Sequence, residues 1–490
     1  MTITEMMPFG VLIPLIAAPI CALLPGRFLP WLTAMVAAGL SALVMAQVLP
    51  AAVDEPLRYA FGNWPPPIGI EFRVDAVNGF IGLLVSLMAT VILPWARISV
   101  NQEIPERQGL FYALFLLAFS GLMGITLTGD AFNLFVFLEI SSLSTYALVA
   151  MGRSKAAPLS AFRYLIMGTL GATFYLIGVG MLYIMTGTLN MVDLAERLPA
   201  VADTRAVQAG FAFIIVGIGV KLALFPLHRW LPGAYANAPS AITVFLSSTA
   251  TKVAVYALLR LVFTVFGVSF ATAMPYAEIF FILGLAGILL PSLWAIRQDN
   301  LKRLLAYSSV AQIGYIILGI SLLSVTGLTS GLVHLFNHAI IKAALFMCVC
   351  TVIYQTGSAR ISAFQGLGRQ MPLTMLAFVL AGLGLIGVPL TAGFISKWML
   401  IQAAIEQDLW LAVVVILVGS LMAVIYIGRV VEIAWIQPPP DGRPAVTEAR
   451  AGLLIPMYVL VLATFYFGID TRLTLDFATA GANVLIGATP

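Results

Sequence analysis

The sequence carries very little charge for its length. Charged residues occupy 9% of its 490 positions, whereas soluble domains carry about 25%. Hydrophobic residues occupy 61%. Because no soluble fold has enough interior to bury so much apolar surface, a soluble globular protein is excluded. The composition predicts a polytopic membrane protein built from apolar helices.

Several other features are scarce or absent. The three cysteines, Cys21, Cys348 and Cys350, all lie in apolar stretches, which predicts buried thiols; a C-x-C pair alone is a weak metal signal. No basic run suggests nucleic acid, and no cofactor motif is present, so we expect neither a redox centre nor a bound metal. No Lys or Arg precedes the first apolar run, so we expect Pro8 onward to be a retained first helix.

Apolar segments of about 17–25 residues mark membrane spans. The sequence predicts an all-α membrane protein with about 14 such spans and no soluble domain. They are expected at residues 8–25, 29–49, 75–95, 109–127, 130–151, 158–186, 207–226, 240–265, 275–296, 302–324, 327–355, 372–404, 409–434 and 451–469.

The distribution of basic residues tests this count, because cytoplasmic loops are rich in Lys and Arg. Loops after odd-numbered spans hold fourteen: Arg27, Arg97, Arg107, Arg153, Lys155, Arg229, Arg297, Lys302, Arg303, Arg360, Arg369, Arg429, Arg443 and Arg450. The other loops and the tail hold five: Arg58, Arg73, Arg197, Arg205 and Arg472. This bias predicts a multi-pass protein of the inner (cytoplasmic) membrane, with both termini on the outer side.

One acidic residue, Glu139, lies near the middle of a predicted span. A charge at this depth costs roughly 2.5–3.5 kcal/mol on the milder scales, so something must pair with it or use it. We assign the other acids to loops or helix ends. Intramembrane acids are functional by default, although Glu139 could also be a structural acid that pairs two helices.

Six basic residues fall inside predicted spans: Arg163, Lys221, Lys252, Arg260, Lys342 and Lys397. The two arginines are expected to snorkel from helix ends. The lysines supply partners for Glu139, either as fixed ion pairs or as proton carriers. Desolvation disfavours a charged amine and a nearby carboxylate favours it, so an amine that alternates between these environments can bind and release a proton.

The histidines extend this polar set. His334, His338 and Lys342 follow one another in steps of four, which places them on one face of a helix. Imidazole titrates near neutral pH, so the stripe suits proton relay; buried core histidines are the alternative. His228, beside Arg229 and a proline turn, is expected in a loop.

Two predicted spans contain helix breakers. Pro226 follows Lys221, and Gly387 and Pro389 precede Lys397. Proline removes a backbone donor, and interrupted spans in separate halves suggest an internal repeat, although simple kinks would have the same sequence. Spans 4–8 and 9–13 would form two inverted five-helix repeats. The expected units are residues 1–108, 109–266, 267–435 and 436–490.

Four motifs carry a resemblance to a known family. They are DNLKRLLAYSSVAQIGYIILG (residues 299–319), HLFNHAIIKAALF (334–346), KLALFPLHRWLPGAYANAPS (221–240) and GVPLTAGFISKW (387–398). In this order they resemble the antiporter-like subunits shared by respiratory complex I, Mrp-type cation/proton antiporters and membrane-bound hydrogenases. The resemblance is strongest over about residues 70–435. The stretch GAYANAPS differs from the sequence that many relatives have at this place. The difference affects the loop between the seventh and eighth helices and not the core of the resemblance.

The resemblance implies fourteen helices, inverted repeats, broken seventh and twelfth helices, and a polar axis in the membrane plane. It implies that Glu139 partners Lys221, that Lys252 continues the axis, and that Lys397 ends it. His334, His338 and Lys342 would form the relay between these lysines. The implied partners are protons, monovalent cations, lipid and other membrane subunits.

Within the family, the D subunit of an Mrp-type Na⁺(K⁺)/H⁺ antiporter fits best. Lys397 stands where the middle complex I subunit has glutamate, and the chain lacks the long C-terminal extensions of larger subunits. A pumping subunit of an NADH:quinone oxidoreductase or energy-converting hydrogenase remains an alternative, as does a structural scaffold of an inorganic-carbon transporter. On each of these hypotheses the chain is a transporter subunit and has no redox centre of its own.

Overall fold

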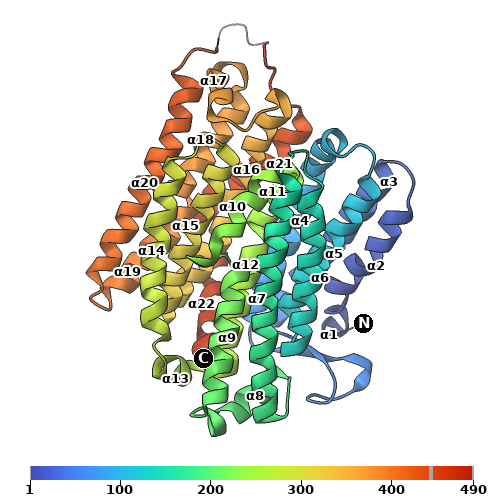
Figure 1. The fold of residues 1–490 in the computed structure, drawn as a ribbon, viewed down its shortest axis with the longest axis vertical. Helices are drawn as coiled ribbons and strands as arrows, with labels where there is room; N and C mark the ends of the chain where they lie inside the picture. The colour runs from blue at the N-terminus through green and yellow to red at the C-terminus, as the bar shows by residue number, and fades with distance from the viewer. Residues whose placement is uncertain (1, 441–444, 488–490) are drawn as a thin grey trace.

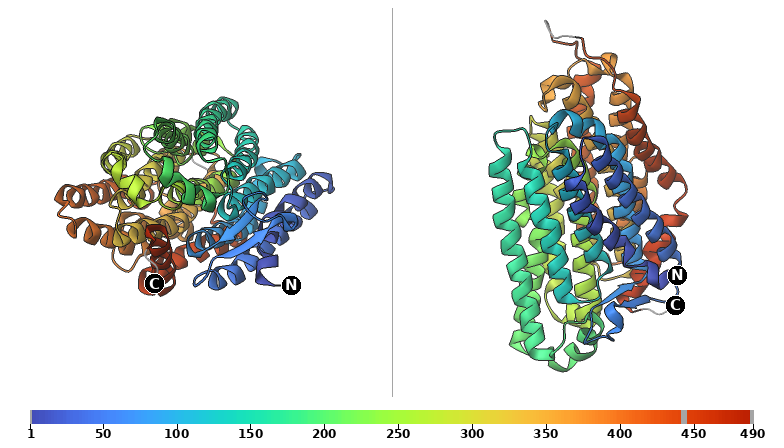
Figure 2. Two further views of the ribbon diagram at one scale, coloured as in Figure 1. Left: turned by 90° about the horizontal axis from the view of Figure 1, so that it is seen from below. Right: turned by 90° about the vertical axis from the view of Figure 1, so that its right-hand side faces the viewer.

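The computed structural model describes residues 2–440 and 445–487, so Arg443 lies outside the described residues. The described chain folds into one helical bundle whose long helices run along a common direction (Figure 1). Both ends of the described chain lie in the lower half of the bundle, toward the same end of the long helices, in Figure 1 and in the right-hand view of Figure 2. An even number of membrane crossings has this consequence.

The first part of the chain forms α1 (Ile3–Met6), α2 (Phe9–Leu23), α3 (Phe28–Ala51), β1 (Leu57–Ala60), η1 (Phe61–Asn63), β2 (Glu71–Val74), α4 (Ala76–Glu103), α5 (Gln108–Leu127), α6 (Ala131–Ala150), α7 (Ala157–Thr186), α8 (Met191–Arg197), η2 (Leu198–Val201), α9 (Arg205–Lys221), η3 (Leu227–Trp230), α10 (Leu231–Asn237), α11 (Ser240–Ser248), α12 (Ala250–Leu259) and η4 (Arg260–Phe266). The short η elements are 3-10 helices, except η4, which is a π-helix. The antiparallel pair β1–β2 is the one sheet of the described chain.

The second part forms α13 (Val268–Ala273), α14 (Tyr276–Ile296), α15 (Leu301–Ser321), α16 (Val325–Thr356), η5 (Ile361–Phe364), α17 (Leu367–Gln370), α18 (Pro372–Ile386), α19 (Ala392–Ile405), α20 (Trp410–Trp435), α21 (Ala451–Ile469) and α22 (Arg472–Ile486). In Figure 1, α17 lies at the top of the bundle, and α8 and α13 lie at the bottom, which we call the α8 end.

The predicted polytopic helical fold is confirmed. Within residues 2–440 and 445–487, twelve helices are long and apolar enough to cross a membrane. The two remaining expected spans, 207–226 and 372–404, are shorter helices next to breaks: α9 and the pair α18 and α19. Each expected span therefore overlaps a helix of the structure, or a group of helices that a break separates.

Two features of the fold differ from expectation. The expected span 240–265 is interrupted at Thr249, where φ is −125° and ψ is −58°, so it consists of α11, α12 and η4. The expected tail after residue 469 contains α22, which packs against α4 and α16. Phe477 of this helix stacks on Phe80, whose ring also stacks on Phe336.

The two inverted repeats stay a prediction, but two loops support them. At the α8 end, Asp130 pairs with Asn190 as an isolated antiparallel bridge between the segments that precede α6 and α8. Asn300 and Arg360 form the same kind of bridge before α15 and η5. Left-handed glycines, Gly187 and Gly357, end the preceding helices in both cases, because glycine adopts this conformation without steric cost.

Close helix packing makes Gly217 a sensitive position. A Cβ atom there would lie 2.5 Å from the Gly171 carbonyl oxygen and 2.6 Å from the Tyr175 nitrogen, and neither backbone atom can rotate away. We expect Gly217→Ala to lower the stability of the folded protein by about 1–3 kcal/mol, measured as a lower melting temperature in detergent. Gly180→Ala is the control, because no atom lies within 4 Å of that Cβ position; equal melting temperatures for the two variants would contradict this prediction.

Candidate functional site

The carboxylate of Glu139 lies beside the amine of Lys221. Glu139 is in the middle of α6 and Lys221 is the last residue of α9, and their charged atoms are 3.7 Å apart. This distance makes an ion pair without a direct hydrogen bond. The amine instead donates to Ser142 Oγ at 2.8 Å and to Tyr146 Oη at 3.5 Å. The partner that the resemblance implies for Glu139 is therefore its neighbour in the fold.

The two members of this pair differ in exposure. The Lys221 side chain is 7% exposed, whereas that of Glu139 is 24% exposed. The amine thus lies inside the bundle, whereas the Glu139 side chain is partly exposed although its Oε1 atom is buried.

The helix that carries Lys221 ends at the predicted break. Ala223 has a left-handed φ of +59°, and Pro226 begins the turn into η3. Trp230 Nε1 donates to the Val220 carbonyl at 2.9 Å, replacing one of the hydrogen bonds that the break removes. Such compensation is what allows a broken helix at membrane depth.

A cavity of about 30 Å³ adjoins the Lys221 amine. Its lining includes Ser142 and Thr145 of α6, and Ala250 and Val253 of α12. A polar cavity of this volume has room for a water molecule. It lies between Lys221 and α12, the helix that carries the next lysine.

That lysine, Lys252, lies at the unexpected break between α11 and α12. Its Nζ donates to the Ser247 carbonyl, in the last turn of α11. The break has no proline or glycine, so the usual signals were absent. Hydroxyls of Ser247, Ser248 and Thr249 bond to carbonyls one turn earlier, and such competition bends helices; this cluster is the signal that sequence reasoning missed.

The three residues of the α16 stripe share one face of the helix, as their spacing predicts, and they lie near Lys252. His334, His338 and Lys342 are all buried, and the two imidazole rings stack with centroids 6.3 Å apart. The charge of Lys252 acts on both histidines. Lys342 Nζ donates to the Leu305 carbonyl at 2.9 Å and also to Ser308 Oγ.

The two histidines have different surroundings. His334 contacts Ser396 Oγ at 2.8 Å through Nδ1 and Gln312 Oε1 at 3.0 Å through Nε2. His338 is 1% exposed, and neither of its ring nitrogens has a hydrogen-bond partner within the described part of the chain. His334 is thus fixed in place, whereas no hydrogen bond in the described chain fixes the ring of His338.

Lys397 lies across the second predicted break. The break contains Gly387, with φ of +88°, and Pro389. Lys397 Nζ donates to the carbonyls of Leu385 and Ile386 at 3.1 and 2.9 Å and to Ser420 Oγ at 3.0 Å. The amine therefore covers the C-terminal end of α18, where a positive charge is favoured by the helix dipole.

The seven predicted site residues lie on neighbouring helices, and all but the partly exposed Glu139 are buried. We call them the buried set: Glu139, Lys221, Lys252, His334, His338, Lys342 and Lys397. The helices that carry them are linked by packing: α7 contacts both α6 and α9, α9 contacts α12, α11 joins α12 to α16, and α16 contacts α19. In the described chain, Lys221 alone of these lysines has a carboxylate as an ion-pair partner. The other amines are held by carbonyls and hydroxyls, which hold an ammonium group without neutralising it.

Comparison with known proteins identifies the family of this chain. Residues 128–423 match the family profile described as "NADH:quinone oxidoreductase/Mrp antiporter, TM". The chain belongs to this family. The matched region contains every member of the buried set, so the predicted resemblance is confirmed.

Three relatives show the range of the antiporter-like family. The chain is 43% identical, over 94% of both sequences, to the N subunit of the NADH-quinone oxidoreductase of Desulforudis audaxviator. It is 28% identical to the D subunit of the Na⁺/H⁺ antiporter of Alkalihalophilus pseudofirmus, over 87% of this chain and 86% of the relative. A chain of the Mrp complex from a Dietzia species matches with a TM-score of 0.92 and 26% identity, covering all of this chain and 98% of its own length.

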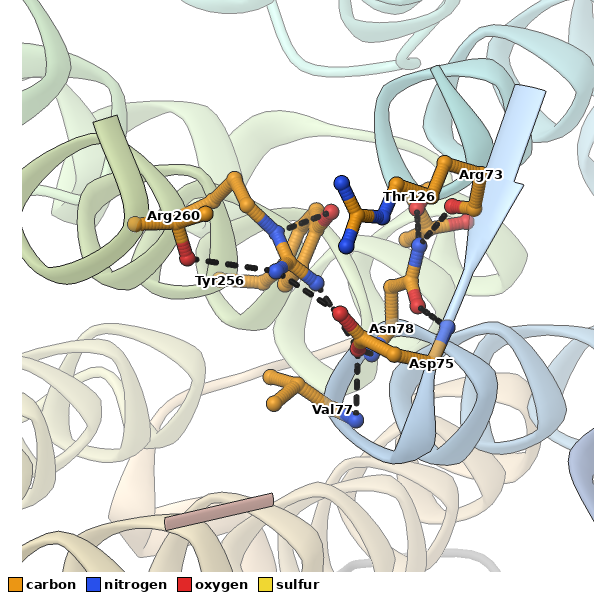
Figure 3. Close-up of polar contacts among 8 residues, drawn as sticks. Arg73, Asp75, Val77, Asn78, Thr126, Tyr256 and Arg260 are labelled. Carbon is orange, nitrogen blue, oxygen red and sulfur yellow. Dashed lines mark hydrogen bonds and ion pairs between the residues drawn. The ribbon is translucent and has the colours of Figure 1, made fainter. Parts of the chain in front are cut away.

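Two expectations about basic side chains in this antiporter-like chain are wrong. Arg260 does not snorkel: it is buried and pairs with Asp75, with Nη1 and Oδ2 2.8 Å apart (Figure 3). His228 is not in an exposed loop: it lies buried in η3, between Phe225 and Trp294 at centroid distances of 5.5 and 5.4 Å. Both residues find partners that local sequence patterns do not reveal.

Proposed function

We propose that this chain is a proton-translocating subunit of a multisubunit membrane complex. The observation that carries the proposal is the set of titratable side chains from Lys221 through Lys252 and His338 to Lys397, buried within apolar helices. Intramembrane ionisable residues are costly, and this makes them functional by default. So many of them in one connected layer are difficult to explain as structural pairs.

The proposed path begins at Lys221 and ends at Lys397. A proton leaving Lys221 crosses the cavity toward Lys252, passes to the unpartnered His338, and continues through His334 to Lys397. Lys342 lies beside this path and repels positive charge at Lys252. Each lysine binds its proton more tightly when a negative charge approaches and less tightly when it is alone, so protons move when the charges rearrange.

Glu139 is the control element of this proposal. It lies 3.7 Å from the Lys221 amine and is partly exposed on α6. A neighbouring subunit on this face would move the carboxylate or change its surroundings, and Lys221 would then hold or release its proton. The route by which protons travel is therefore distinct from the contact through which the partner acts.

Two parent complexes are candidates, each with its own support. An Mrp-type Na⁺(K⁺)/H⁺ antiporter, with this chain as its D subunit, is supported by Lys397 at the second break and by the likeness to an antiporter D subunit. A redox-driven complex, of the NADH:quinone oxidoreductase or hydrogenase kind, is supported by the 43% identity to an oxidoreductase N subunit. In both, this chain translocates protons and the energy source lies elsewhere. The inner membrane, with the α8 end outward, is the proposed location.

Purification of the native complex distinguishes the parents. The complex would be extracted in mild detergent through a tag on this chain, and its subunits identified by mass spectrometry. Small antiporter subunits without redox proteins support the antiporter, and flavin or iron–sulfur subunits support the redox complex. A chain that purifies alone and drives no proton movement after reconstitution would contradict the proposed function.

A further inference from the structure

A second line of polar side chains leaves the buried set at Lys252. Lys252, Tyr256, Arg260 and Thr264 follow one another in steps of four along α12 and η4, which places them on one side of this span. Arg260 Nε donates to Tyr256 Oη at 3.3 Å, and Arg260 Nη1 donates to Thr264 Oγ1 at 3.2 Å. The line runs from the middle of the bundle to the α8 end.

The line ends on a buried ion pair that several elements hold in place. The side chains of Arg260 and Asp75 are 8% and 3% exposed. Asp75 also caps α4, accepting from the backbone N–H groups of Val77 and Asn78 at 3.0 and 3.4 Å. Asn78 Nδ2 in turn donates to the Thr126 carbonyl at 2.8 Å (Figure 3). The carboxylate is therefore fixed between α4, α5 and η4.

Positive charge is in excess around this pair. Arg73 of β2 lies beside it in Figure 3, and its buried Nε has no hydrogen-bond partner in the described chain. Arg58 is opposite Arg73 in the hairpin. Burial lowers the pKa of Arg73, and the charges of Arg58 and Arg260 lower it further, whereas the carboxylates of Asp75 and Glu71 raise it. Three guanidinium groups therefore face two carboxylates.

A small space connects these groups to α8. A cavity of about 20 Å³ is lined by Arg73, Tyr256, Arg260, Thr264 and residues of α8. It has room for a water molecule, so a proton could pass here if the charges allowed it. Fixed guanidinium groups at such a constriction repel protons and metal cations.

We infer that Asp75, Arg260 and Arg73 form a seal that stops protons passing between Lys252 and the aqueous phase at the α8 end. The inference rests on the proposed function, because a seal is needed only if Lys252 carries protons. Helix capping alone requires the Asp75 carboxylate and the N–H groups of α4. It does not require the buried guanidinium of Arg260 or the half-buried one of Arg73 beside it, and a buried ion pair is weak evidence of a stabilising role.

The seal depends on the pairing of Asp75. With Arg260 in place, the carboxylate is held ionised by a bidentate partner and cannot act as a relay. Without Arg260, an unpaired buried carboxylate takes up a proton readily. It would then be a proton carrier close to the 20 Å³ cavity that Tyr256 and Arg260 line.

Passive proton permeability of the reconstituted complex tests this inference. With the driving reaction absent, a pH difference is imposed on liposomes and its decay is followed with a trapped dye. Arg260→Gln should accelerate the decay at least fivefold over the unaltered complex. Asp75→Asn should stay tight, because asparagine also caps helices and carries no protonatable carboxylate. The double variant should have the low proton permeability of the unaltered complex, because it has no carboxylate that could relay protons.

The comparison separates a seal from simple damage to packing. A double variant that leaks as fast as Arg260→Gln, or an Arg260→Gln variant that stays tight, would overturn the inference. If Arg260→Gln fails to assemble, Arg260→His decides, because a neutral imidazole also leaves the Asp75 carboxylate without a charged partner; equal permeability of Arg260→His with and without Asp75→Asn would overturn the inference. Driven proton transport by the unaltered complex tests the proposed function in a separate experiment. The proposed function and the seal can therefore be refuted independently.

Discussion

Replacing Glu139 with glutamine should lower driven proton transport by the reconstituted complex at least tenfold. The substitution keeps the volume of the side chain and removes the carboxylate 3.7 Å from Lys221. Two unit charges about 4 Å apart interact by about 4 kcal/mol at an effective dielectric constant of about 20. A tenfold change in proton occupancy requires only about 1.4 kcal/mol, so even a well-screened pair is sufficient.

Two further variants show whether the loss of transport in Glu139→Gln is caused by the loss of its charge. Glu278→Gln removes an exposed acid in the first turn of α14 and should leave transport unchanged. Ser142→Ala removes the 2.8 Å hydrogen bond to Lys221 without changing charge, and should reduce transport less than Glu139→Gln. The rate and its pH profile would be measured by dye quenching in liposomes. A Glu139→Gln complex that transports like the unaltered one would refute the control role of this acid.

Replacing Lys397 with methionine should also lower transport at least tenfold, and for a different reason. Lys397 is the last titratable group of the proposed path and the amine that covers the end of α18. The variant leaves two carbonyls with fewer partners, and an unsatisfied buried group costs about 1–3 kcal/mol. A lower melting temperature should therefore accompany the loss of transport.

Lys397→Gln separates these two effects. The amide can still donate to the carbonyls of Leu385 and Ile386 but cannot carry a proton. It should recover much of the melting temperature and none of the transport. Trp398→Phe is the control, because this neighbouring side chain is exposed. Transport that recovers together with stability in Lys397→Gln would show that Lys397 is structural.

The sequence was informative where a residue type is energetically unfavourable at its position. A charge or a proline inside an apolar helix is unusual in itself, so Glu139, the lysines and Pro226 could be identified singly. The apolar segments predicted the spans for the same reason. These signals are local, so they can be read without knowledge of the fold. The structure places Glu139 beside Lys221 and Pro226 at a helix break.

What the sequence did not reveal depends on contacts between distant segments. Arg260 and Asp75 are 185 positions apart, so an arginine near a helix end suggested snorkelling. His228 is buried because Trp294 of α14 packs on its ring. The break at Thr249 has neither proline nor glycine. α22 is too polar for a span, and its neighbours α4 and α16 explain why it is folded.

The most direct test of the account is the pH dependence of transport with Lys252 replaced. Lys252 joins the Lys221 region to the α16 histidines, so every proton on the proposed path must occupy it. Lys252→Met should abolish driven proton uptake in a complex that contains all its subunits. Lys252→His should retain part of it, with the pH profile shifted to lower pH, because imidazole releases its proton at lower pH than an amine. Uptake by Lys252→Met at the rate and pH optimum of the unaltered complex would contradict a proton path through this chain.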